Sequence, residues 1–158
     1  MHGKHRSIIV ISTMLAALAL ASPAAASSEA VDVEGRQAVS TGGQCPEGSF
    51  VMSGDLDGCW TTDSFRLVAA NPSGVVVGSG TETFVGCIGS RCGTLSFSFV
   101  FVGRFDAAGA EVRGGCHHPV KGGTGDFAGA RGELNFVDDP DGSWLPPADY
   151  SGHVVFRD

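Results

Sequence analysis

A regular alternation of apolar and polar residues between Thr94 and Phe105 is the feature that most constrains the fold of this chain. Four large apolar residues recur at every second position of this stretch: Leu95, Phe97, Phe99 and Phe101. Successive side chains of a β-strand point to opposite faces, so this period of two predicts a strand with one aromatic face and one mixed face. Which of the two faces points inward stays open at this point.

Similar stretches follow one another at short intervals, separated by turn signals rich in Gly, Asp, Asn and Pro, and helical spacing is not sustained anywhere. Seven strands are predicted: Ser49–Asp55, Thr61–Ala70, Val75–Gly86, Thr94–Phe105, Glu111–His118, Gly129–Val137 and Tyr150–Phe156. A short extended segment at Thr124–Phe127 would be the eighth. Because the connections have hairpin length and a sheet of this size protects its edges by closing, we expect an all-β fold, an eight-stranded antiparallel up-and-down β-barrel.

The N-terminus is typical of an export signal. Basic residues at positions 2–6 precede the apolar stretch Ile8–Ala21, which is short for a membrane span, and Ala24-Ala25-Ala26 fits a cleavage site. We predict a signal peptide over residues 1–26, with an uncleaved N-terminal anchor as the alternative. Residues 27–46 show no regular spacing of apolar residues, so we predict that they form a flexible segment. Residues 47–158 would form a single β-barrel domain.

Acidic residues outnumber basic ones. The chain has 10 Lys and Arg against 17 Asp and Glu, a net charge of −7, and loss of Lys4 and Arg6 with the signal peptide would leave 8 − 17 = −9. A surface of this sign repels phosphate groups, which excludes nucleic acid as a partner. No stretch after residue 26 is apolar enough to span a membrane, so we expect a secreted, extracellular protein that has no membrane partner.

Five cysteines lie outside the predicted signal peptide: Cys45, Cys59, Cys87, Cys92 and Cys116. Export permits disulfides, and the odd count leaves one thiol free. Cys87 and Cys92 flank a turn-like insert between two predicted strands, which predicts a disulfide across a hairpin. The other three cysteines allow three pairings, of which we favour Cys59–Cys116, because Cys45 lies in the segment expected to be flexible.

A His pair and a glycine-rich run follow Cys116. Neighbouring strand residues point to opposite faces, so His117 and His118 cannot easily bind one ion, and no Cys-x-x-Cys pair is present. Residues 123–128 formally fit a dinucleotide-binding fingerprint, but two later glycines would break the helix that this fingerprint needs. The glycines indicate tight turns and a bulge instead, and we expect neither a metal site nor a cofactor.

The run Gly122-Gly123-Thr124-Gly125-Asp126-Phe127-Ala128-Gly129-Ala130-Arg131-Gly132 resembles the GGTGxFxxAxG signature of the allene oxide cyclase-like and dirigent proteins. The segment Gly80-Thr81-Glu82-Thr83-Phe84 and the Phe-rich strand fit the same scheme. Cys116-His117-His118-Pro119 also fits it and resembles bacterial secreted relatives of that barrel group. Spanning residues 47–157, the resemblance implies an eight-stranded antiparallel barrel, often trimeric and therefore a homo-oligomer. It also implies cofactor-free activities, fatty-acid epoxide cyclisation or orientation of phenoxy radicals, that act by positioning a bound intermediate.

A pocket in such a barrel would combine an apolar lining with a few polar groups. The candidate ligand-binding residues are Glu82, Phe84, Phe97, Phe99, Phe101, Arg104 and His117. Glu82 and His117 are also the candidate catalytic residues, because a carboxylate in mid-strand and an imidazole at a barrel mouth can each supply a polar contact or move a proton.

Two functions fit these observations. The first is a secreted, disulfide-bonded barrel that binds a small apolar or aromatic molecule, with cyclase, isomerase or radical-guiding activity as an extension. The second is a non-enzymatic extracellular interaction or structural protein with a filled barrel, whose loops or exposed aromatic face bind a partner. An interior cavity with polar groups would favour the first function, and a filled interior with an apolar outer face would favour the second.

Overall fold

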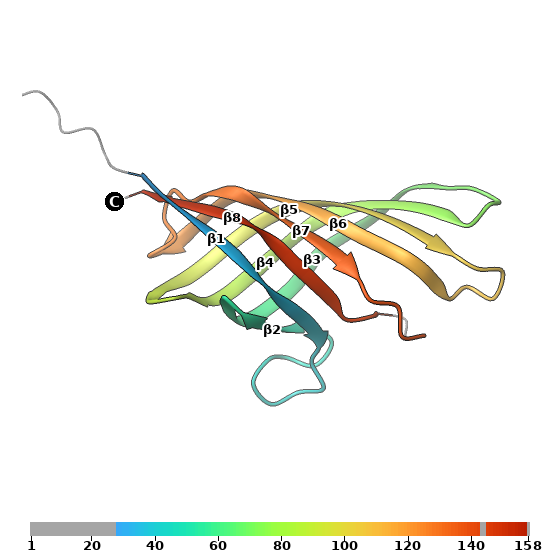
Figure 1. The fold of residues 1–158 in the computed structure, drawn as a ribbon, viewed down its shortest axis with the longest axis horizontal. Helices are drawn as coiled ribbons and strands as arrows, with labels where there is room; N and C mark the ends of the chain where they lie inside the picture. Colours follow the sequence, from blue (N-terminus) through green and yellow to red (C-terminus); the bar gives the residue numbers. More distant parts are fainter. Residues whose placement is uncertain (1–27, 143–144, 158) are drawn as a thin grey trace, which may run out of the picture.

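The computed structural model describes residues 28–142 and 145–157, so the predicted signal peptide lies outside the described residues. Eight antiparallel strands each pair with the next along the chain, and β8 pairs with β1, which closes the sheet into a barrel (Figure 1). This confirms the predicted all-β architecture. The strands are β1 Ser28–Val39, β2 Phe50–Gly54, β3 Leu56–Ala70, β4 Val75–Ile88, β5 Arg91–Phe105, β6 Glu111–Gly125, β7 Arg131–Asp138 and β8 Ala148–Arg157.

The first strand corrects the prediction for residues 27–46. Instead of a flexible segment, Ser28–Val39 forms β1, which pairs with β8 from Ser28 to Gln37 and with β2 from Gly35 to Val39. Without β1, two strands would expose open edges, and Val33 would be missing from the core. The barrel therefore begins at Ser28 rather than at residue 47. The predicted eighth strand at Thr124–Phe127 is wrong, because these residues form the end of β6 and the turn that follows it.

Two disulfides link the chain. Cys87–Cys92 joins directly opposite positions of β4 and β5, as predicted, whereas Cys59 pairs with Cys45 and Cys116 is free. The favoured Cys59–Cys116 pairing is therefore wrong. Cys59 precedes the inward-pointing Trp60 and so faces outward, while Cys116 shares the inner face of β6 with the buried His118.

The aromatic face identified in the sequence points inward. Trp60, Phe84 and Phe97 are at most 1% exposed, and they fill the closed part of the barrel with further apolar side chains from every strand. The alternate positions of β5, among them Val100 and Val102, form the outer surface. The closed part of the barrel thus encloses a packed core.

The barrel is unequal at its two ends. β2 pairs with β3 only as far as Phe50 opposite Trp60, so the rest of β3 has β4 alone as a neighbour. The β3–β4 and β5–β6 hairpins continue together beyond this point, and Figure 1 shows both projecting from one side of the barrel. We call this part the extension: residues 61–70, 75–81, 98–105 and 111–117. Its inner face continues the lining of the barrel but is open to solvent.

Intact-mass and peptide analysis should find one free thiol, on Cys116, and a Cys45–Cys59 linkage. Burial, together with nearby carboxylates, raises the pKa of the Cys116 thiol above its ordinary value. Since the thiolate is the reactive form, alkylation should be slow in the native protein and fast after unfolding without reductant. A peptide in which Cys59 is linked to Cys116 would contradict this structure.

Candidate functional site

The Glu82 carboxylate is the centre of a buried polar cluster. It projects inward from β4 and accepts hydrogen bonds from Trp60 Nε1 at 2.8 Å and Thr62 Oγ1 at 2.7 Å. His118 Nε2 lies 2.6 Å from Glu82 Oε2, and both side chains are buried. Because a carboxylate accepts all three hydrogen bonds, this arrangement places a proton on Nε2 of His118.

The strand register brings these residues together. Thr62 of β3 lies opposite Glu82 of β4, and His118 reaches the same point from β6. The imidazole is surrounded by aromatic rings, with Phe136 at 4.6 Å, Trp60 at 5.3 Å and Phe99 at 5.7 Å between centroids. Within the described residues, its Nδ1 atom is buried and has no hydrogen-bond partner. This nitrogen can accept or donate a proton or hydrogen bond, while Glu82 fixes the ring.

A second polar group lies further along the inner face. A register shift in the β5–β6 pair, between Arg104 opposite Arg113 and Phe105 opposite Glu111, separates Glu111 from the outward-facing Arg113. A side chain at position 114 would overlap the carboxyl groups of both Glu111 and Asp138. Because Gly114 has no side chain, the two carboxyl groups can approach each other there. We call Glu111 and Asp138 the acid pair.

Burial and mutual contact change the protonation of the acid pair. Burial raises the pKa of Glu111, and contact with Asp138 adds to this effect and brings it to about 7. Burial also raises the pKa of Asp138, although Glu111 and His118 oppose the shift. Since two adjacent carboxyl groups resist simultaneous ionisation, the acid pair holds a proton near neutral pH.

The inner face of the extension is aromatic and open. The Phe65 ring covers Gly78, the Phe99 ring approaches Gly80, and both Phe101 and Phe105 approach Gly103, positions at which any side chain would clash with these rings. Although they lie on the inner face, Phe65 and Leu67 are 58% and 56% exposed. We call this surface the aromatic platform: Phe65, Leu67, Phe99, Phe101 and Phe105. Its exposed apolar area comes mainly from Phe65 and Leu67, whereas Phe101 and Phe105 are half-buried and Phe99 is buried.

Cys116 lies on the same inner face, in register with Phe101 of β5 and Phe136 of β7. Its raised pKa leaves it as a thiol at neutral pH, because burial and the surrounding carboxylates disfavour the thiolate. Cys116 therefore contributes a small apolar lining group rather than a nucleophile.

The structure places five of the predicted site residues on the inner face and two on the outer face. Glu82, Phe84, Phe97 and Phe99 point inward and are buried, and Phe101 is partly buried on the same face: the inward set is Glu82, Phe84, Phe97, Phe99 and Phe101. Arg104 and His117 lie on the outer face. Arg104 is exposed on the outer face, and the exposed His117 contacts Asn135 at 3.0 Å and Glu133 at 3.7 Å.

The sequence prediction named His117, whereas the buried polar cluster contains His118, and it did not include the acid pair. On β6, Cys116 and Val120 share a face with His118 and pack against the core. This alternation of apolar residues is the sequence signal that could have identified His118 as the inward-pointing histidine. Glu111 shows no such signal. The β5–β6 register shift places it on the inner face, and a shift of this kind changes which residues share a face.

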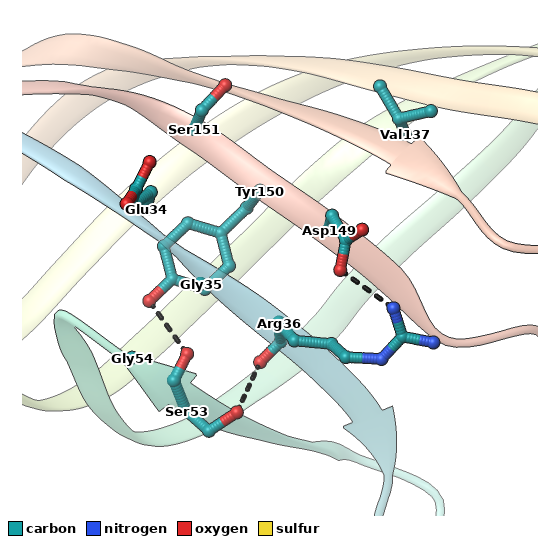
Figure 2. Close-up of a pocket in the computed structure, with 9 residues that line it drawn as sticks. All are labelled: Glu34, Gly35, Arg36, Ser53, Gly54, Val137, Asp149, Tyr150 and Ser151. Carbon is teal, nitrogen blue, oxygen red and sulfur yellow. Dashed lines mark hydrogen bonds and ion pairs between the residues drawn. The ribbon is translucent and has the colours of Figure 1, made fainter.

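A separate groove lies on the outer surface near the β1–β2 corner (Figure 2). Arg36 bridges Asp149 and Asp139, each at 2.7 Å. The Tyr150 hydroxyl donates to the Ser53 carbonyl and accepts from the Leu56 amide. Because the arginine and the tyrosine hydroxyl are already engaged with neighbouring residues, we interpret this groove as a structural corner that closes the barrel.

No family model, curated protein or solved structure matches this chain. The resemblance to the allene oxide cyclase-like group therefore stays a prediction, and the geometry of the site carries the functional argument. In residues 28–142 and 145–157, no group of three or more His, Cys, Asp or Glu side chains is placed to hold a metal ion. The same residues contain no helix of the length and apolarity needed to cross a membrane.

Replacing Glu111 by Gln should change how stability depends on pH. The folded-state pKa of about 7 lies above the ordinary value of 4.5, so the native state binds the extra proton between these two values. The free energy of unfolding should therefore fall as the pH rises from about 4.5 to about 7. Gln cannot ionise, so E111Q should gain stability relative to the wild type across this window.

Urea unfolding at pH 4.5, 6 and 7.5 would measure this difference. The matched control is E47Q, because Glu47 is exposed in the loop before β2. Parallel stability curves for the wild type and E111Q would show that the Glu111 carboxyl does not hold the proton.

Proposed function

We propose that this protein is a secreted barrel that binds a small apolar or aromatic molecule on the aromatic platform. The exposure of Phe65 and Leu67 carries the proposal, because they lie on a face whose other large side chains are mostly buried. A bound molecule would remove this apolar area from water and stack on the rings. The two exposed side chains of the platform offer a small apolar contact area, which suits a small ligand better than a large partner.

Secretion is the second part of the proposal. Its support is the signal-like N-terminus in the sequence together with the two disulfides, which are compatible with an extracellular protein. The Cys45–Cys59 disulfide ties the loop after β1 to β3, and Cys87–Cys92 closes the β4–β5 hairpin. Both bonds therefore restrain the strands that carry the site.

Catalysis on the bound molecule is a second candidate function, favoured by the unpartnered Nδ1 of His118. Glu82 holds the opposite nitrogen of this ring, as a carboxylate does for the base in many enzymes that move protons. A molecule on the platform lies next to Phe99, which contacts the imidazole. A cofactor-free cyclase or isomerase, the activity implied by the family resemblance, would use His118 to move one proton.

The interaction-protein alternative has its own support, since the closed part of the barrel is filled by side chains and the outer face carries exposed valines. In that case, a protein partner or a second copy would cover the exposed apolar surface. The trimer implied by the family resemblance also remains a proposal, which the native mass of the purified protein would test.

Replacing Leu67 by Ser should weaken the binding of a neutral two-ring aromatic such as 1-naphthol by about tenfold. The variant loses the binding free energy that the apolar contact area of leucine contributes. The control is V102S, since Val102 is 52% exposed in the same extension but on the outer face. NMR titration would measure both affinities. Equal binding by the two variants, or no binding by the wild type, would contradict the proposed site.

A further inference from the structure

We infer that the molecule bound by the aromatic platform is a planar organic cation, such as an aromatic amine or a quaternary aromatic ammonium ion. This inference rests on the proposed function and adds the chemical class of the ligand. It is carried by the placement of the acid pair beside the aromatic rings.

The first observation is the juxtaposition of Gly103 and Gly114. These two glycines are directly opposite each other in the β5–β6 register. Phe101 covers Gly103, and the acid pair covers Gly114, so the ring and the carboxyl groups lie about one strand spacing, roughly 5 Å, apart on the same face. A flat molecule stacked on the Phe101 ring would place its edge near the two carboxyl groups.

The second observation is that the acid pair lacks a cationic partner. Within the described chain, neither Glu111 nor Asp138 forms a salt bridge with Lys or Arg, and the contact of Glu111 is with the other acid. The nearest arginines in the register, Arg104 and Arg113, project from the outer face. The inner face therefore carries a carboxyl pair that no Lys or Arg side chain of the described residues neutralises.

An organic cation could interact favourably with both the aromatic rings and the acid pair. The faces of phenylalanine rings attract cations within about 6 Å, and carboxylates pair with ammonium groups at close range. A neutral aromatic molecule would leave the acid pair without a partner, and an anion would be repelled by it. The net charge of −7 further favours the approach of cations.

Binding of a permanent cation should also depend on pH. The titratable groups near the acid pair are His118 and Cys116 on β6, and Glu82 on β4 lies beyond them, against His118. A cation favours the ionised carboxylates, so it should displace the proton that the acid pair holds near neutral pH. The affinity should therefore rise between pH 5.5 and pH 8.

Three two-ring aromatics of similar size test the inference: the cation 1-methylquinolinium, neutral 1-naphthol and the anion 1-naphthalenesulfonate. Calorimetric titration at pH 8 should give binding of the cation at least about tenfold tighter than that of the neutral probe, with the anion weakest. In the E111Q/D138N double variant this preference should disappear, while binding of 1-naphthol should be retained. The L67S variant should instead weaken the cation and the neutral probe alike.

Three failures are distinguishable. Binding of 1-naphthol as tight as that of 1-methylquinolinium in the wild type would overturn the cation inference and leave the proposed site intact. Absence of binding for all three probes would overturn the proposed function and this inference with it. If circular dichroism shows that the double variant is folded, a cation preference that persists in it would show that the acid pair is not the source of this preference.

Discussion

The hydrogen bonds that converge on Glu82 hold the interior of the barrel in its observed arrangement. A buried carboxylate is costly unless it is paired, and here Trp60, Thr62 and His118 supply its partners from two other strands. The same contacts fix the orientation of the largest core side chain and of the only buried imidazole in the described chain. The closed, packed part of the barrel and its open extension meet at this cluster.

Beyond the cluster, glycines determine how the inner face is built. On β4 and β5 they replace side chains that would otherwise fill the space above the sheet, and the rings of Phe65, Phe99 and Phe101 occupy that space instead. On β6, Gly114 has the same effect for the acid pair. A small residue on one strand thus creates room for a ring or a carboxyl from its neighbour, which yields an open aromatic surface with an acidic border.

The sequence predicted the architecture well because strand alternation and turn residues are local signals. The period of two in β5 and the spacing of Cys87 and Cys92 both led to features present in the structure. β1 was missed because its pairing with β8 joins opposite ends of the chain, and its polar outward residues obscured the alternation of Val31 and Val33. Contacts of this kind leave little trace in a local pattern.

The site was predicted only in part for a related reason. Alternation assigned Phe97, Phe99 and Phe101 to one face correctly, but it did not show which face of β6 points inward, so His117 was named rather than the buried His118. The register shift before Arg113 then separated Glu111 from the face that simple alternation assigned to it. Each error follows from register, which strand pairing sets and a single sequence does not show.

The most direct test of this account is the stability of the Glu82→Gln variant, measured by urea unfolding beside Glu47→Gln, a control in the exposed loop before β2. A glutamine at position 82 would present an amide group to three hydrogen-bond donors, so the account predicts a loss of about 1–3 kcal/mol or more relative to the control. Unfolding free energies that are equal for the two variants would contradict the central role of the Glu82 carboxylate.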